Sequence, residues 1–368
     1  MKILYIDPMS RKNLGIYGKN LLENINGEKY FFASEGFQFD KIKDTTIIFN
    51  YNYYLKRNIF KIISYIYSQF KLVKWILNNN PDIIHIQWVR LPIFDSIILF
   101  IVKKLRKRSK IVYTAHNALP HDSNNKLFLY QYYILYHLFD GIIVHINRTK
   151  QELINLFHLA ETSIREIPHG TLEFDVYITE KRLYPDKTLF SMTGSMNYYK
   201  GVDILINAWI SNKNLINDYT IHLIIAGASN IPLEKIPSNS NITIINRQLT
   251  DTEYQLIINS TDVGILPYRQ ISQSGVLLSL LTKHKPVIVS DCGGLTQPFN
   301  IGKVGWIIDG LSAETLSKTI QNVVQNKQDI LNIQNDNILW NKIDNFYSWK
   351  NIGRYTMDFY NLVVNSPL

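Results

Sequence analysis

The sequence predicts an α/β protein built from two doubly wound, Rossmann-like domains. The chain has 368 residues, about twice the usual length of one domain. Short, nearly uniformly apolar segments alternate with segments of helical periodicity, a pattern typical of parallel sheets covered by helices on both faces. The alternation stops at a polar connection, residues 171–187, and then restarts. A second domain of the same class is therefore expected.

The first domain is expected over residues 1–170. Its predicted strands are residues 2–6, 46–50, 83–86, 111–114, 141–145 and, more weakly marked, 164–167. The segments between them have helical periodicity at residues 17–25, 56–78, 92–107, 125–138 and 149–156. Ligands of such sheets bind outside the carboxyl ends of the strands, so side chains that follow a strand are the candidates for a site.

The second domain is expected over residues 171–345. Its predicted strands are residues 188–192, 222–226, 242–245, 263–266, 286–290 and 304–308. Helices are predicted at residues 201–209, 252–260 and 313–325, and a further one after residue 275. A last helical segment in residues 346–368 is expected to pack back on the first domain. Two such domains would face each other across a cleft that holds a ligand.

Composition places the protein among soluble, globular chains. Hydrophobic residues make up 46% and charged residues 19% of the sequence, which suffices for large cores. The single cysteine, Cys292, cannot form an internal disulfide, so a reducing compartment such as the cytoplasm is expected. The chain begins with a strand pattern rather than a signal peptide. The most apolar stretch, residues 91–102, is too short to span a bilayer.

The net charge of +9 is unevenly distributed. Residues 103–110 are densely basic, and Lys56, Arg57, Lys61, Lys71 and Lys74 are interleaved with aromatic and aliphatic residues. A solvated helix face and a nucleic-acid surface are two interpretations, but no nucleic-acid-binding motif accompanies the charge. Basic residues among bulky apolar ones on amphipathic helices favour peripheral contact with the anionic inner face of the cell membrane.

One segment has the pattern of an anion site. Ser272, Gln273, Ser274 and Gly275 stand where a polar turn becomes a helix between two apolar strands. The first N–H groups of a helix lack internal partners and carry the positive end of its dipole, so they suit an anion such as a diphosphate. The alternative is an ordinary serine-capped helix. The neighbouring motifs favour the anion site.

Five further patterns stand at the ends of predicted strands, in a fixed order. They are Pro81-Asp-Ile-Ile-His-Ile-Gln-Trp88, Tyr113-Thr-Ala-His-Asn117, Ile167-Pro-His-Gly170, Gly194 followed by Lys200-Gly201, and Asp262-Val-Gly-Ile-Leu-Pro-Tyr-Arg269 with Lys285-Pro-Val-Ile-Val-Ser-Asp-Cys-Gly-Gly294. Together with the serine-glycine turn they resemble the GT-B glycosyltransferases, specifically retaining family 4 (glycosyl transferases group 1), over essentially the whole chain.

The resemblance implies a nucleotide-sugar donor, with UDP as the expected base and GDP as the alternative. Breaking the sugar–phosphate bond builds negative charge on the leaving diphosphate, which fixed donors and cations must stabilise. The resemblance assigns Lys200 to the diphosphate, against the alternative of a surface lysine. Arg247 and Arg269 are secondary candidate cations, and Arg269 has the alternative of a solvated turn residue. No cofactor is implied.

The resemblance also implies roles in the first domain. The histidine at the position of His116 contacts the transferred sugar in the family, and its alternative here is a hydrogen-bonded structural histidine. Gly15 stands in the loop after the first strand, where the backbone would meet the donor unless the glycine only forms a turn. His85, His121 and His169 are weaker candidates, of which His85 and His121 would line the acceptor side.

The sequence departs from the family at its acidic positions. Two glutamates seven residues apart are common in the family, but Ser279 occupies the second position and Ile271 or Ser272 the first. An arginine that usually follows the glycine of the opening turn is replaced by Ser195. No metal is expected, because no Asp-x-Asp motif has carboxylates suited to a cation bound to a diphosphate.

The sequence thus predicts a hexosyl-type, metal-independent transferase. Its predicted reaction moves a sugar, with retention, to a lipid-linked glycan during cell-surface polysaccharide synthesis. The alternatives are a catalytically silent sugar-nucleotide-binding protein of the same fold and a GT-B sugar-nucleotide epimerase. A dinucleotide-binding dehydrogenase is disfavoured because the first strand lacks a Gly-x-Gly-x-x-Gly turn.

Overall fold

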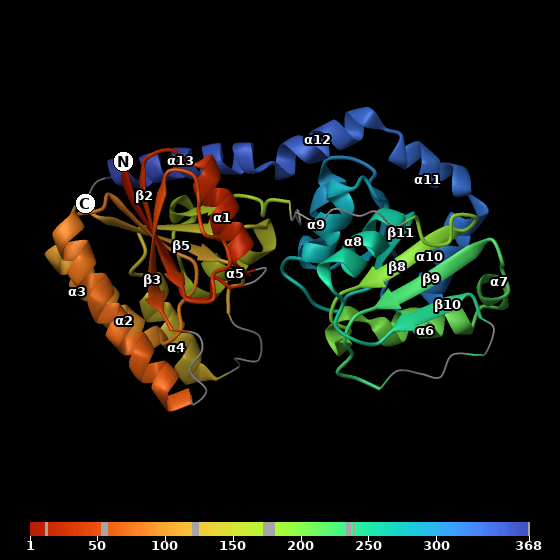
Figure 1. Ribbon diagram of the computed structural model, residues 1–368, viewed down its shortest axis with the longest axis horizontal. Helices are drawn as coiled ribbons and strands as arrows, with labels where there is room; N and C mark the ends of the chain where they lie inside the picture. The colour runs from red at the N-terminus through yellow and green to blue at the C-terminus, as the bar shows by residue number, and fades with distance from the viewer. Residues whose placement is uncertain are drawn as a thin grey trace. The chain divides into compact units, whose positions relative to one another are not determined.

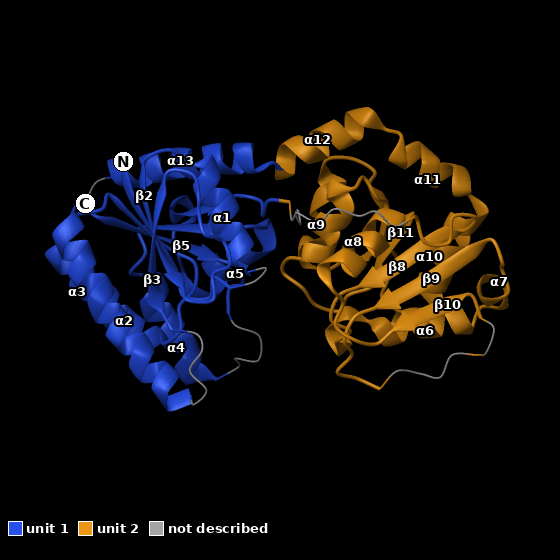
Figure 2. Cartoon of the chain, in the orientation of Figure 1, with its two compact units in different colours: residues 1–170, 348–368 blue, residues 171–347 orange. Residues whose placement is uncertain are grey.

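A computed structural model describes residues 1–11, 14–52, 58–119, 125–171, 181–232, 237 and 240–366. The chain divides into two compact units (Figure 2). Unit 1 comprises Met1–Gly170 and Ser348–Leu368, and unit 2 comprises Thr171–Tyr347. Each unit is an α/β domain with one parallel sheet (Figure 1), so the predicted fold class is confirmed.

Unit 1 holds a seven-stranded sheet in the order β3-β2-β1-β4-β5-β6-β7. Its strands are β1 (Lys2–Asp7), β2 (Glu28–Ser34), β3 (Thr45–Tyr51), β4 (Ile83–Ile86), β5 (Lys110–Ala115), β6 (Gly141–Val144) and β7 (Ile164–Glu166). Its helices are α1 (Leu14–Asn24), α2 (Asn58–Asn79), α3 (Pro92–Leu105), α4 (Lys126–Tyr136), α5 (Asn147–Phe157) and α13 (Trp349–Asn365), with a short 3₁₀ turn, η1 (Glu161–Ser163).

Alternating residues of β1 face two separate cores. Leu4 and Ile6 join the apolar side chains of α2, α3, α4 and α5. Ile3 and Tyr5 join those of α1 and α13. Helices therefore cover both faces of the sheet, which explains why its strands are almost wholly apolar. The C-terminal helix α13 is an integral part of this unit, because it packs along α1.

Unit 2 holds a six-stranded sheet in the order β10-β9-β8-β11-β12-β13. Its strands are β8 (Thr188–Thr193), β9 (Ile221–Ala226), β10 (Ile242–Ile245), β11 (Val263–Leu266), β12 (Val287–Ser290) and β13 (Gly305–Ile308). Its helical elements are η2 (Tyr198–Lys200), α6 (Val202–Ile210), α7 (Lys213–Ile216), α8 (Asp251–Ser260), α9 (Gly275–Thr282), η3 (Gly293–Asn300), α10 (Ala313–Gln325), α11 (Lys327–Gln334) and α12 (Asn337–Tyr347).

The structure adds elements that the sequence pattern does not predict. The strand β2 was missed because its apolar run follows Glu28 and Lys29. Lys29 is nevertheless buried, and its amine donates hydrogen bonds to the carbonyls of Leu22 and Ile25. The sequence of α11 is largely polar, whereas α12 carries Leu339, Trp340, Ile343 and Tyr347 at helical spacing and was overlooked. Among the described residues, no helix is long and apolar enough to cross a membrane.

Candidate active site

Three segments of unit 2 meet at the carboxyl ends of β8 and β11. Gly194 follows β8 with φ +88°, and a Cβ there would lie 3.1 Å from Lys200 Nζ and 3.4 Å from a methyl of Val276 in α9. Gly201 has φ +68°, and a Cβ there would lie 2.1 Å from the Pro267 carbonyl oxygen. Both positions require glycine. The glycine turn, Lys200 and the start of α9 therefore lie close together in the structure.

The Lys200 amine is buried without a counter-ion. The residue is only 9% exposed, and its Nζ lies 5.4 Å from the centre of the Tyr268 ring. No carboxylate of a described residue forms an ion pair with it. Burial lowers the pKa of Lys200 to about 8, because a charged amine is poorly solvated there. A bound anion would supply the missing partner.

The start of α9 presents a further unpaired donor. Ser274 caps the helix by accepting a hydrogen bond from Leu277 N at 3.3 Å. The Gln273 side-chain nitrogen is buried with no hydrogen-bond partner among the described residues. Ser272 is held in place because its carbonyl oxygen accepts a hydrogen bond from Gly294 N at 3.0 Å. Buried polar groups normally have partners, so the Gln273 side-chain nitrogen indicates a polar ligand.

His116 follows β5 at the carboxyl edge of the unit 1 sheet, and both its ring nitrogens and its ring contact neighbouring side chains. Its Nε2 lies 2.9 Å from Gln87 Oε1, and its Nδ1 lies 3.2 Å from His145 Nε2. Its ring stacks on Trp88 at 4.6 Å between centroids and meets Tyr17 edge to face. Burial, reinforced by the neighbouring histidines, holds the pKa of His116 well below its usual range.

The hydrogen bonds fix one proton arrangement in this cluster. His145 Nδ1 lies 2.9 Å from the Ile167 carbonyl oxygen, so the proton of a neutral His145 is on Nδ1. Its Nε2 then accepts from the Nδ1–H of His116, which leaves the lone pair of His116 on Nε2. The structure places Gln87 Oε1 at this atom and Gln87 Nε2 at Thr114 Oγ1, so a hydrogen bond to His116 Nε2 requires the opposite assignment of the Gln87 amide oxygen and nitrogen. Both ring nitrogens of His116 are therefore used inside unit 1.

The remaining unit 1 candidates are accounted for by packing or lie outside the described residues. Gly15 lies inside α1 and not in the loop after β1, so its expected place was wrong. A Cβ there would lie 2.9 Å from the Phe37 ring, so close packing explains the absence of a side chain. His85 is fully buried, between the Tyr360 hydroxyl at 2.5 Å and Thr114 Oγ1 at 2.7 Å. His169 packs against Tyr17 and Trp349. His121, Lys56 and Arg57 lie outside the described residues.

Two parts of the sequence match known families. Residues 187–326 match the family described as glycosyl transferases group 1. Residues 35–171 match the one described as glycosyltransferase family 4. Together the two matches cover more than half of the chain. The chain is a family 4-like glycosyltransferase of the GT-B fold.

Solved structures agree with this fold for the glycosyltransferase. A glycosyltransferase from Rickettsia africae is 16% identical, with a TM-score of 0.70 and 99% of each chain covered. Sucrose-phosphate synthase from Thermosynechococcus elongatus is 15% identical, with a TM-score of 0.69 and 98% of each chain covered. HepE from Anabaena, in complex with UDP and glucose, is 12% identical, with a TM-score of 0.70 and 97% of this chain and 98% of that chain covered. A search of curated proteins finds no match.

The two secondary cations of the glycosyltransferase are already paired. Both terminal nitrogens of Arg269 bind Asp203, at 2.8 and 2.6 Å, and the same side chain donates to the Tyr198 carbonyl oxygen at 2.6 Å. This pairing ties the turn after β11 to η2 and α6. Arg247 forms an exposed bidentate pair with Glu253, which lowers the pKa of Glu253 to about 2. Lys200 therefore differs from both arginines in having no charge partner.

Ser279 occupies a glutamate position of the family, but its hydroxyl is used within α9. It donates to the Gly275 carbonyl oxygen at 3.0 Å, and the residue is 3% exposed.

Sequence reasoning overlooked Gln87 and His145 of the histidine cluster. The available signal was position, because His145 follows β6 and Gln87 follows β4 at the same sheet edge as His116.

Proposed function

We propose that the protein transfers a sugar from a nucleoside-diphosphate donor to a glycan acceptor. The observation that carries this proposal is the buried, uncompensated Lys200 amine beside the unpaired Gln273 amide and the start of α9. Cationic and N–H donors at a helix start suit a diphosphate. Membership of the glycosyltransferase group supports this donor class, and the fold shared with HepE, solved with UDP and glucose, supports UDP.

In the proposed reaction, the bond between the sugar anomeric carbon and the diphosphate oxygen breaks. The electron pair stays on the leaving nucleoside diphosphate, an acceptor hydroxyl oxygen bonds to the anomeric carbon, and the proton of that hydroxyl passes to a phosphate oxygen of the leaving group. Lys200 and the first N–H groups of α9 stabilise the charge on the leaving group. Because these donors are fixed in the fold, we propose that a divalent cation is not needed. Retention of the anomeric configuration is proposed from the family alone.

A thermal-shift screen of nucleotide sugars tests the donor proposal. A ligand that binds only the folded protein stabilises it by about 2.7 kcal/mol at one hundred times its Kd, so one donor should raise Tm with increasing concentration. UDP-sugars are expected to give the response, with GDP-sugars as the second group of the panel. A panel without any response would contradict the proposal. Binding without transfer to any acceptor would favour a catalytically silent protein instead.

Donor affinity should depend on pH through Lys200. The pKa of the Lys200 amine in the ligand-free protein is about 8, and only the protonated amine attracts the diphosphate. Bound phosphate would raise this pKa, so the Kd should be constant below pH 8 and increase above it by up to tenfold per pH unit. Calorimetric titrations between pH 7 and 10 measure this. A Kd that stays flat to pH 10 would exclude Lys200 as a charged donor ligand.

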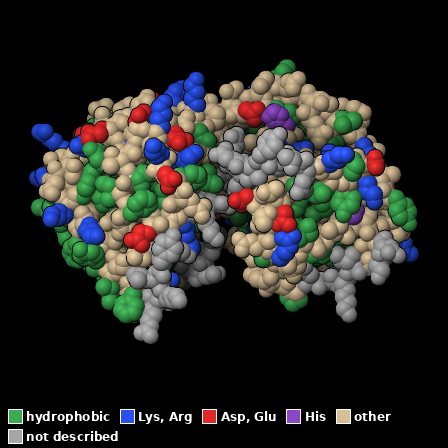
Figure 3. All heavy atoms as spheres, in the orientation of Figure 1, with side chains coloured by type: hydrophobic (Ala, Val, Ile, Leu, Met, Phe, Trp, Pro, Cys, Tyr) green, Lys and Arg blue, Asp and Glu red, His purple; other side chains and the backbone are tan. Residues whose placement is uncertain are grey.

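We further propose that the acceptor is lipid-linked and that unit 1 contacts the membrane. The outer surfaces of α2 and α3 expose large apolar side chains, including Phe60, Ile63, Phe70, Ile97 and Phe100, each at least 49% exposed. Helices α2, α3 and α4 pack side by side, and Figure 3 shows apolar and basic side chains intermingled on unit 1. Lys71 and Lys104 lie over the rings of Tyr67 and Phe100. This combination suits an anionic bilayer surface.

Vesicle flotation tests the membrane proposal. We expect wild type to float with vesicles of phosphatidylcholine and phosphatidylglycerol, and less so at high salt. Phe70→Ser/Phe100→Ser should reduce the partition coefficient by about tenfold or more, because two apolar anchors are lost. Leu331→Ser/Ile338→Ser removes residues of similar exposure, 49% and 72%, from unit 2 and should have little effect. Equal flotation of both variants would contradict the assignment of this surface.

A further inference from the structure

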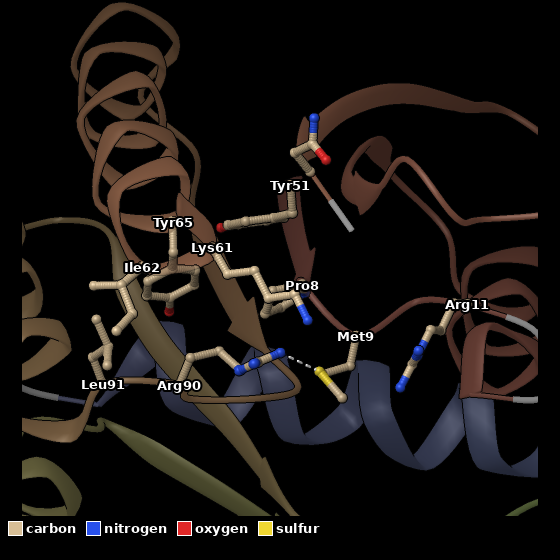
Figure 4. Close-up of a pocket in the computed structure, with 10 residues that line it drawn as sticks. Pro8, Met9, Arg11, Tyr51, Lys61, Ile62, Tyr65, Arg90 and Leu91 are labelled. Atoms are coloured by element: carbon tan, nitrogen blue, oxygen red, sulfur yellow. Dashed lines mark hydrogen bonds between the residues drawn. The ribbon is translucent and has the colours of Figure 1, made fainter. Parts of the chain in front are cut away.

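Unit 1 contains a preformed cavity at the carboxyl ends of β1 and β3. Its volume is about 230 Å³, less than the ~300–1,000 Å³ of pockets that enclose drug-sized ligands. Its walls come from the loop after β1, the end of β3, the first turns of α2 and the turn before α3. Figure 4 shows Lys61 of α2 and Arg90 extending toward Met9, with Arg11 beyond it. The cavity fits a headgroup rather than a whole glycolipid.

Among the described residues, the lining of the cavity includes three cations and no carboxylate. Arg11, Lys61 and Arg90 all contribute to its lining. Neither Lys61 nor Arg90 forms an ion pair with a described residue, and the Arg90 guanidinium instead contacts the Met9 sulfur. A thioether is a weak acceptor, so it leaves the guanidinium charge available. An anion in the cavity would gain charge-assisted hydrogen bonds from the Lys61 and Arg90 side chains.

The nearest acidic groups are used to build the cavity wall. Asp95 is buried, and it accepts hydrogen bonds from the Tyr65 hydroxyl at 2.9 Å and from the backbone N–H groups of Arg90 and Leu91 at 3.0 and 2.9 Å. Tyr65 stacks on Tyr51 at 5.8 Å. Asp7 is 2% exposed, and its carboxylate accepts from Met9 N at 2.8 Å. These contacts hold the two tyrosines, Met9 and Arg90 in place without a ligand.

The cavity continues onto the apolar surface of α2. Ile62 lines the cavity and is 42% exposed. Ile59 and Ile63, on the same first turns of α2, are 58% and 55% exposed. A ligand that fills the cavity with an anionic group can therefore lay an apolar chain along this helix. The apolar chain then lies along α2, the helix that also contributes Lys61 to the cavity.

We infer that this cavity binds the phosphate or diphosphate of an amphiphilic acceptor whose apolar chain follows α2. The inference rests on the proposed function, and it narrows the acceptor to a phosphate-bearing amphiphile. Lys61 and Arg90 bind the phosphate oxygens, and Arg11 adds positive charge from the loop after β1. Tyr51 and Tyr65 form the aromatic wall behind the anionic group.

Binding of geranyl diphosphate, measured by calorimetry in saturating UDP so that the proposed diphosphate site at Lys200 is already occupied, tests the inference. The charge-removing variant Lys61→Gln/Arg90→Gln should bind at least tenfold more weakly than wild type, because hydrogen bonds to charged groups are the stronger ones. The matched control Lys350→Gln/Arg354→Gln also removes one lysine and one arginine, both exposed on α13 of unit 1 and outside the cavity lining, and should stay within about twofold. Equal losses in both variants would overturn the inference, as would the absence of binding to wild type.

Two further ligands show whether the cavity binds a phosphate-bearing amphiphile or a free phosphate. Inorganic diphosphate should bind more weakly than geranyl diphosphate but with the same dependence on Lys61 and Arg90, and geraniol should not bind detectably. If inorganic diphosphate bound as tightly, a free phosphate rather than an amphiphile would be the ligand, and the inference would fail. A donor thermal shift on the same variants distinguishes this failure from that of the proposed function. Donor binding that persists in Lys61→Gln/Arg90→Gln leaves the glycosyltransferase proposal standing.

Discussion

Lys200→Met is expected to lower sugar transfer by roughly 10²–10³-fold, the cost of removing one fixed donor to a developing anion. The same substitution should raise Tm by a few degrees at pH 7. Methionine retains much of the unbranched apolar stem, while the buried charge that burial disfavours is removed. A loss of activity combined with a gain of stability is typical of a residue placed for ligand binding rather than for folding.

The pH dependence of stability gives a second readout for Lys200. Its pKa is about 8 in the folded protein, against an ordinary value of 10.5. Between these values the unfolded chain binds more protons than the folded one, so wild-type stability rises with pH through this window. Lys200→Met lacks this group, so the stability difference between variant and wild type should shrink from pH 8 to pH 10. Urea unfolding at several pH values measures it.

A lysine on the surface of unit 2 provides the control. Lys303 has 64% of its side chain exposed, so Lys303→Met makes the same substitution where the amine is solvated. We expect transfer within about twofold of wild type and no gain in stability. If Lys200→Met kept wild-type transfer, or lost transfer only because it unfolded, Lys200 would not be the diphosphate ligand.

Gly201→Ala is expected to destabilise unit 2 by roughly 3 kcal/mol or more. Its φ of +68° costs about 1–2 kcal/mol for a residue with a side chain, and its Cβ would collide with the Pro267 carbonyl oxygen at 2.1 Å. Relieving such a collision moves the backbone, at a cost of about 1–3 kcal/mol. Because Lys200 is the adjacent residue, the amine would shift from Gly194 and transfer should fall as well.

Gly310→Ala measures the cost of the backbone conformation alone, without the collision. Gly310 has a similar φ of +71°, but a Cβ there would meet nothing within 4 Å. This variant should lose only the conformational part, about 1–2 kcal/mol, and should keep its transfer activity. Urea unfolding of both variants gives the comparison. Equal losses would show that the contact with Pro267 relaxes without cost.

The sheet strands of each domain were largely predictable because parallel strands buried on both faces are almost wholly apolar. The exceptions have physical causes. The strand β2 begins with a lysine that is buried but solvated by two carbonyl oxygens, and polarity alone cannot distinguish this from an exposed loop. Helix α11 buries only Ile330 and Ile333, so its periodicity is weak, whereas α12 buries four residues at helical spacing and its pattern was available in the sequence.

The parts of the candidate site that were predictable are those whose location depends only on their position in the chain relative to the strands. Gly194, Lys200 and Gly275 all follow or flank strands that are neighbours in one parallel sheet, which is why they converge. Side-chain pairing was not predictable, because partners such as Asp203 and Arg269 are 66 residues apart. The engagement of both His116 ring nitrogens depends on His145 and Gln87, each 29 residues away in the sequence. Such contacts depend on side-chain conformations that no local pattern specifies.

The most direct test of the central claim is the titration of Lys200 by ¹H–¹³C spectroscopy of its side chain, with and without the nucleotide sugar found in the screen. The free protein should show a lysine with a pKa of about 8, absent in Lys200→Met. The bound diphosphate should move this pKa up by two units or more, since each unit corresponds to about 1.4 kcal/mol of interaction. A pKa that the bound donor leaves unchanged would contradict the assignment of the diphosphate to Lys200.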